Sequence, residues 1–231
     1  MNLEYGFVTI IIVIKGFWRM SMNWYPRENY LRKIRDFYHE ADLIKVITGV
    51  RRCGKSCLME TIAEEIKNSG VKEENVIYFD LDSDEYNHIE KGTQLKKLIR
   101  GAACNNDLKY LFIDEVQNVE GFETVLNGFR GSGEWSIFIT GSNSYLLSGE
   151  LSTKLTGRYV EFEMFTLSFE EYEGMKTFYN KEIAADRSVE MQNYILEGGF
   201  PRTINLKSMS AKRKYVQSVI KEIFEKDIRT T

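Results

Sequence analysis

The residues with the clearest chemical meaning are two glycines, a lysine and a serine in the segment GVRRCGKSC. Gly49, Gly54, Lys55 and Ser56 have the spacing G-x-x-x-x-G-K-S, between the apolar run LIKVIT and a stretch of helical periodicity. Glycines let backbone N–H groups surround an anion, a helix start adds its positive dipole end, lysine adds a mobile charge, and a hydroxyl suits Mg²⁺. The segment therefore predicts a P-loop, which binds the phosphates of a nucleoside triphosphate. The residues expected to form it are Gly49, Val50, Arg51, Arg52, Cys53, Gly54, Lys55, Ser56 and Cys57.

Three side chains inside this loop each allow two interpretations. Arg51 and Arg52 either contact phosphate or a partner, or they are solvated loop cations. Cys53 is either a reactive thiol, because a helix start stabilises a thiolate, or a small residue that fits the turn. The sequence favours the second interpretation for Cys53.

An acidic pair supplies the groups that a bound metal and an attacking water need. Asp114 and Glu115 follow the apolar residues of YLFIDE, at the carboxyl end of a predicted strand. Ligands bind at this edge of open parallel sheets. We expect Asp114 to hold Mg²⁺ through water and Glu115 to act as the general base. The alternative is that the pair caps the start of a helix.

Two further side chains are candidates for contacts with the transferred phosphate. Asn143 follows WSIFITGS, and a strand between those of the P-loop and Asp114 would bring Ser142 and Asn143 beside the γ-phosphate. A turn or a helix cap is the alternative. Arg158, in LTGRYVEF, begins a predicted strand. It either stabilises transition-state charge, in its own subunit or a neighbouring one, or pairs with an acid.

Apolar runs alternate with amphipathic segments along most of the chain. This alternation predicts an α/β fold, a three-layer α/β/α sandwich with a five-stranded parallel sheet. After residue 168 the pattern is helical, which predicts a C-terminal helical lid. The expected divisions are an N-terminal extension at 1–24, a nucleotide-binding core at 25–167 and the lid at 168–231. The predicted strands are 43–50, 76–82, 109–115, 135–142 and 159–165, and the predicted helices are 56–68, 93–104, 121–129, 168–179, 188–199 and 211–228.

Composition narrows the class of protein. The chain has 231 residues, of which 43% are apolar and 28% charged, and its net charge of −3 argues against a surface that binds nucleic acid throughout. Three cysteines without paired spacing predict a cytoplasmic protein with neither a disulfide framework nor a zinc site. The apolar run at 7–14 is shorter than the ~20 residues that cross a membrane, and it lacks the pattern of a secretory signal. We therefore expect no membrane association.

The combined motifs resemble those of a known family. GVRRCGKS, FIDEVQNV, ITGSNSYLLSGELSTKLTGRYVEFEMF and EGGFP are together similar to the AAA-type (AAA+) P-loop ATPases of bacteria and archaea that usually carry a nuclease-like C-terminal domain. The resemblance covers residues 25–228 and implies ATP and Mg²⁺ as cofactors. Such proteins continue past the segment KDI into a further domain, so we expect the chain to be truncated before that domain. The roles implied are metal and water for Asp114 and Glu115, a phosphate sensor for Asn143, the arginine of the Gly-Arg motif for Arg158, and a lid contact beside the nucleotide for Pro201.

Three functions remain open. The first is slow, Mg²⁺-dependent hydrolysis of ATP for an unknown client. The second is a nucleotide-dependent switch or scaffold with negligible turnover, because contacts with a γ-phosphate commonly order a lid. The third is a DNA-associated ATPase, suggested by the four cations of KSMSAKRK at 207–214 but not supported by the net charge. The expected partners are ATP or ADP, further copies of the chain and an unidentified protein client.

Overall fold

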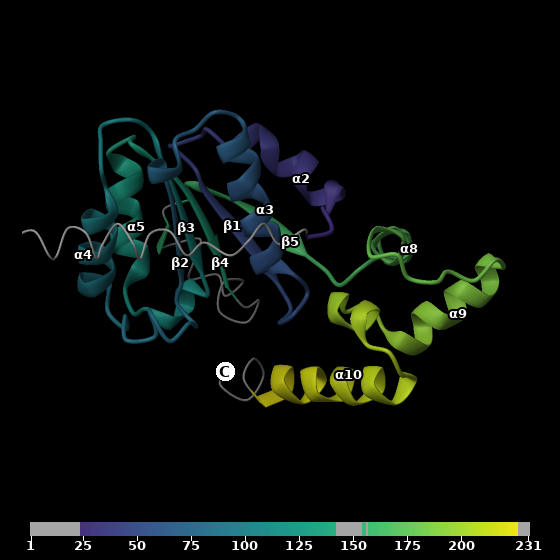
Figure 1. Cartoon of the computed structure of the whole chain (residues 1–231). Coiled ribbons are helices and arrows are strands. Elements are labelled where there is room, and N and C mark those ends of the chain that lie inside the picture. Colours follow the sequence, from purple (N-terminus) through teal and green to yellow (C-terminus); the bar gives the residue numbers. More distant parts are fainter. Residues whose placement is uncertain (1–23, 142–153, 156, 226–231) are drawn as a thin grey trace, which may run out of the picture.

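Five parallel strands form the centre of the molecule (Figure 1). They are β1 (Ile44–Gly49), β2 (Val76–Asp80), β3 (Lys109–Asp114), β4 (Trp135–Thr140) and β5 (Tyr159–Met164). The computed structural model describes residues 24–141, 154–155 and 157–225. The strand order is β2-β3-β4-β1-β5, and each neighbouring pair is parallel. The predicted five-stranded parallel sheet is thus confirmed, with strand ends that differ by one or two residues.

Helices cover both faces of the sheet (Figure 1). Because side chains alternate along a strand, Phe112 and Phe138 pack into one apolar cluster, whereas Ile113 and Ile139 pack into another on the opposite face. Helices α2 (Glu28–Ile34) and α3 (Lys55–Asn68) contribute to the first cluster, and α4 (Gly92–Ala102) and α5 (Phe122–Gly131) contribute to the second. The sheet is therefore the middle layer of an α/β/α sandwich. Among the described residues before β5 there are also the single-turn helices η1 (Arg35–Phe37), η2 (Glu73–Asn75) and η3 (Val116–Asn118).

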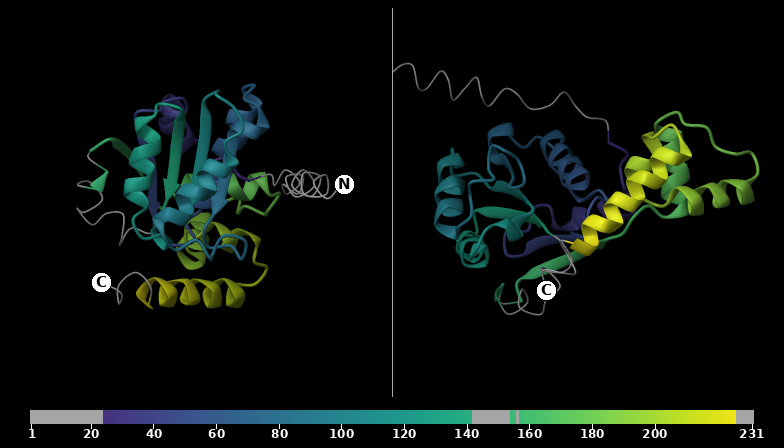
Figure 2. Two further views of the ribbon diagram at one scale, coloured as in Figure 1. Left: turned by 90° about the vertical axis from the view of Figure 1, so that its left-hand side faces the viewer. Right: turned by 90° about the horizontal axis from the view of Figure 1, so that it is seen from below.

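The segment after β5 is helical, and part of it packs around an apolar cluster of its own. This cluster contains Leu167, Tyr172, Met175 and Ile204. Ser168 starts the first helix with a capping box. The Ser168 hydroxyl accepts a hydrogen bond from the Glu171 amide, and the Glu171 carboxylate accepts one from the Ser168 amide. Figure 2 shows the last helix, in yellow, running from this unit back toward the sheet. The helices are α8 (Phe169–Phe178), α9 (Arg187–Glu197), η4 (Pro201–Asn205) and α10 (Met209–Ile223).

None of the helices in the described part of the chain combines the length and the apolar character that crossing a membrane requires. The apolar run at 7–14 lies outside the described residues.

Candidate functional site

The P-loop connects the end of β1 to the start of α3, and its two glycines are required by its shape. Gly49 has a φ of 149°, and a methyl group on it would lie 2.2 Å from the carbonyl oxygen of Met164. Gly54 has a φ of 109° directly before α3. Residues with a side chain rarely adopt such backbone conformations, so glycine is needed at both positions for the loop to close tightly.

Lys55 begins α3 and directs its ammonium group back into the loop. The side chain is buried, and Nζ donates to the carbonyl oxygens of Gly49 at 3.0 Å and Val50 at 3.5 Å. The Glu115 carboxylate lies 3.9 Å from the same nitrogen. The one mobile cation of the motif is therefore held between the loop and the acidic strand end.

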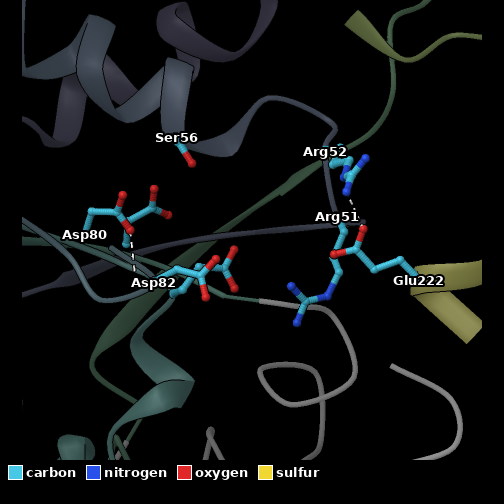
Figure 3. A pocket seen from close by; sticks show the side chains of 8 residues that line it. Arg51, Arg52, Ser56, Asp80, Asp82 and Glu222 are labelled. Atoms are coloured by element: carbon cyan, nitrogen blue, oxygen red, sulfur yellow. Dashed lines mark hydrogen bonds and ion pairs between the residues drawn. The ribbon is translucent and has the colours of Figure 1, made fainter. Parts of the chain in front are cut away.

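A cavity of about 340 Å³ lies beside the loop. Figure 3 shows Arg51, Arg52 and Glu222 at one end of this cavity and Asp80 and Asp82 at the other, with Ser56 between them. The cavity therefore has two arginines with a paired carboxylate at one end, two aspartates at the other and a hydroxyl between them, and this set of groups suits a polyphosphate bound with a divalent metal ion. Its full lining is Arg51, Arg52, Ser56, Asp80, Asp82, Asp114, Glu115 and Glu222.

The predicted metal ligand, Asp114, is held at both of its carboxylate oxygens. Oδ1 accepts a hydrogen bond from the Thr140 hydroxyl, and Oδ2 accepts one from the Tyr78 hydroxyl at 3.3 Å. Burial, followed by the negative charge of Asp114, raises the pKa of Tyr78 well above its ordinary value. The phenol therefore stays protonated and keeps donating to the carboxylate.

The predicted base, Glu115, has an unusual backbone conformation. Its φ is 55°, in the left-handed region that residues other than glycine adopt rarely. Its amide donates to Thr140 Oγ1 at 3.0 Å, and its Oε2 accepts from Gln117 Nε2 at 2.5 Å. Both the backbone and the carboxylate of Glu115 are therefore fixed by hydrogen bonds at the edge of the cavity.

Two P-loop side chains differ from one another in exposure. Cys53 is fully buried, and burial raises the pKa of its thiol. This contradicts the interpretation of Cys53 as a reactive thiolate, because desolvation outweighs the nearby positive charges of Lys55 and Arg27. Arg52 instead reaches α10, where it pairs with Glu222 at 2.6 Å and lies 5.5 Å from the centre of the Tyr215 ring.

Comparison with known proteins identifies the fold and the family. A family model described as an AAA domain matches residues 41–173, more than half of the chain. The chain belongs to the AAA domain family. The AMPPCP-bound DnaA of Aquifex aeolicus has the same fold, with a TM-score of 0.54 at 21% identity over 86% of this chain and 67% of that one.

Two relatives are similar to most of this chain and are longer than it. An uncharacterised protein of Haemophilus influenzae is 39% identical over 187 residues, which is 80% of this chain and 46% of the relative. An uncharacterised protein of Methanocaldococcus jannaschii is 32% identical over 191 residues, which is 80% of this chain and 42% of the relative. The chain thus spans less than half the length of either relative.

Further residues outside the P-loop and β3 were predicted to contact the nucleotide. Ser142 and Asn143 lie outside the described residues, but β4, which precedes them, does lie between β1 and β3. Pro201 starts η4 beside the loop, and a methyl group on Gly54 would be 3.8 Å from Pro201 Cγ. Their contacts with nucleotide stay predictions.

Arg158 lies away from the cavity of its own AAA domain. Its carbonyl oxygen accepts from the amide of Ile44, at the amino end of β1, whereas the P-loop follows the carboxyl end. The side chain is 58% exposed and pairs with Asp42 at 3.4 Å. The structure thus does not bring Arg158 together with the P-loop, and action on a neighbouring subunit stays a prediction.

Several side chains of the site were not predicted. Asp80 and Asp82 follow a strand end as Asp114 does, so the sequence VIYFDLD carried a signal for them. Thr140 is a polar residue at the end of an apolar strand, which is a weaker signal. Glu222 comes from α10 and has no local sequence feature that points to the P-loop.

Proposed function

We propose that this chain binds ATP together with Mg²⁺ and hydrolyses the ATP. The proposal is carried by the observation that one cavity is lined both by Ser56 of the P-loop and by the strand-end acids Asp114 and Glu115. These residues fit a bound Mg²⁺ ion, because hydroxyl and carboxylate oxygens are the ligands that Mg²⁺ prefers in proteins. Gly49 and Gly54 both have a positive φ, and glycines of this kind let the backbone N–H groups of a loop turn toward an anion.

The groups of the chain divide the chemistry between them. Lys55 would transfer its hydrogen bonds from the loop carbonyls to phosphate oxygens. Ser56 and Asp114 would hold the metal ion, which when bound neutralises charge on the phosphates. Glu115 would accept a proton from the attacking water, while Gln117 keeps its carboxylate in place.

The test is phosphate release from ATP and Mg²⁺ by the wild-type chain and by Glu115→Gln. We expect the variant to bind ATP as the wild type does and to lose at least about a hundredfold in turnover, the lower range for a general base. Glu120→Gln is the matched control, because Glu120 is exposed and does not line the cavity. Lys55→Ala should lose nucleotide binding itself, and unchanged ATP affinity in that variant would contradict the P-loop assignment.

A nucleotide switch is the second candidate, and the ion pair between Arg52 and Glu222 favours it. This pair connects the P-loop to α10, so a change in the contacts of Arg52 would alter the position of the proposed helical lid. A switch is supported if the wild type and Glu115→Gln both bind ATP and neither releases phosphate.

The same proposal includes the cytoplasm as the site of action. The sequence contains three cysteines without paired spacing, as is usual in proteins of reducing compartments. A DNA-associated role receives less support. Lys212 of the basic segment pairs with Glu197 at 2.5 Å and is mostly buried, so this cation is already neutralised.

A further inference from the structure

The hydroxyl of Thr140 connects the two acidic residues of the site. It donates to Asp114 Oδ1, and it accepts from the amide of Glu115 at 3.0 Å. Thr140 is the last residue of β4 and is fully buried. A hydroxyl has one proton to donate, so these two bonds fix the direction of that proton toward the carboxylate.

The sheet explains why Thr140 reaches both partners. Ile113 and Ile139 are register neighbours in the parallel pair of β3 and β4, so Asp114 and Thr140 lie side by side at the strand ends. Alternation along each strand places both side chains on the face that carries Phe112 and Phe138, which is covered by α3. This is the helix that begins at Lys55, so the hydroxyl is on the P-loop side of the sheet.

Each of the two bonds has a distinct consequence for the site. Asp114 has its Oδ1 held by Thr140 and its Oδ2 by Tyr78, so the plane of the carboxylate beside the cavity is set from two sides. Glu115 has its backbone held in the left-handed conformation by the bond to Thr140. That conformation is unfavourable for a residue with a side chain and persists only where the surroundings fix it.

We propose that Thr140 is a positioning residue that sets the metal-binding carboxylate of Asp114 and the basic carboxylate of Glu115 relative to each other. The proposal rests on the ATPase function above, in which the two acids serve metal and water. Thr140 itself contacts neither the metal nor the attacking water in this scheme. Its effect is therefore on the response to Mg²⁺ and on turnover, and not on the metal-free binding of ATP by the P-loop.

The experiment compares Thr140→Val, which removes the hydroxyl at nearly constant volume, with Thr140→Ser, which keeps it. Binding of a non-hydrolysable ATP analogue is measured with and without Mg²⁺, and turnover is measured at saturating ATP. In Thr140→Val we expect metal-free affinity within about twofold of wild type. The Mg²⁺ concentration that gives half of its effect on binding of the analogue should rise about tenfold. This factor corresponds to about 1.4 kcal/mol, as for a lost hydrogen bond to a charged group. Turnover should fall by at least the same factor, and Thr140→Ser should recover both quantities.

The control is Ser136→Ala on the same strand. Ser136 is also fully buried and donates to the carbonyl oxygen of Tyr38 at 2.7 Å, at the opposite end of β4. A general weakening of the sheet would affect both variants, whereas loss of positioning would change the Mg²⁺ response of Thr140→Val alone. Thermal unfolding of every variant shows which of them are folded, and Thr140→Ala replaces Thr140→Val if the valine does not pack.

Each outcome decides the matter. A raised Mg²⁺ requirement that serine restores and Ser136→Ala lacks would support the proposal. A wild-type Mg²⁺ response and turnover in the folded variant without the hydroxyl would overturn it, as would an equal change in Ser136→Ala. A wild-type chain that binds no ATP would instead reject the proposed function, so the two failures are distinguishable.

Discussion

Arg52 in the P-loop and Glu222 on α10 form an ion pair of 2.6 Å at the edge of the cavity. The guanidinium also lies over the Tyr215 ring of the same helix. A cation of the P-loop is thus already held by α10, which places a carboxylate where the negative charge of a bound phosphate would enter. Phosphate and Glu222 should therefore compete for Arg52.

Removal of the Glu222 charge should strengthen nucleotide binding. We expect Glu222→Gln to bind ATP about three- to tenfold more tightly, because a negative charge facing the phosphates is lost while the side chain keeps its size. Isothermal titration calorimetry at low and high salt measures the effect, which should shrink as salt screens the charges. Glu225→Gln is the control, since Glu225 pairs with Lys221 on the same helix and does not line the cavity. Weaker binding by Glu222→Gln would show that the lid contact assists binding.

Removal of one partner from the buried pair of Arg27 and Glu171 should destabilise the fold strongly. Arg27 donates to Glu171 at 2.8 and 2.6 Å, to the Cys53 carbonyl at 3.2 Å and to the Phe165 carbonyl at 3.1 Å. Arg27→Ala would leave the Glu171 charge buried and unpaired, so we expect a loss of about 3–5 kcal/mol in the free energy of unfolding. Urea denaturation measures it. Arg35→Ala, which breaks partly exposed pairs, should cost about 1 kcal/mol or less, and equal losses would contradict this assignment.

Lys45 should make the free energy of unfolding rise with pH in the alkaline range. It is fully buried, and burial lowers its pKa from 10.5 to about 7. Between these two values the unfolded chain binds a proton that the folded chain does not, so raising the pH favours the folded state by up to about 1.4 kcal/mol per pH unit. We expect the stability of the wild type relative to Lys45→Met to rise from pH 7 to pH 10. A constant difference across this range would show that Lys45 stays charged when buried.

The cysteines should differ sharply in their reaction with a thiol reagent. Cys104 is exposed, whereas Cys53 is fully buried with a raised thiol pKa. We expect rapid modification of Cys104 in the native protein and modification of Cys53 only after unfolding, measured by mass spectrometry of peptides. In Cys104→Ser the rapid phase should disappear. Fast labelling of Cys53 that ATP prevents would restore the interpretation of a reactive loop thiol.

The parts of the site that follow local patterns were predictable from the sequence. The P-loop needs glycine at two fixed positions, and Gly49 and Gly54 have the backbone conformations that this requirement implies. The buried strands were equally clear, since each is a run of apolar residues between turn or helix signals. Asp114 and Glu115 were placed correctly at a strand end because strand direction in a parallel sheet fixes which ends meet.

The contacts that depend on distant segments were not predictable in the same way. Arg27 meets Glu171, and Arg52 meets Glu222, through the packing of helices that are far apart in the sequence. Helix α2 was missed because its seven residues carry too little periodicity to identify it. The burial of Cys53 depends on how α2, β5 and the loop pack together, which no local pattern describes.

The pairing of Gly49 with Met164 determines how the molecule would carry mechanical load. β5 runs parallel to β1, and the two strands are paired from Ile44 to Gly49. Because the C-terminal helices follow directly after β5, tension on these helices would pull along this strand and load its hydrogen bonds with β1 in shear. The pair nearest the pulled end is Met164 with Gly49. The tension would therefore act first on the backbone of Gly49, where the P-loop starts.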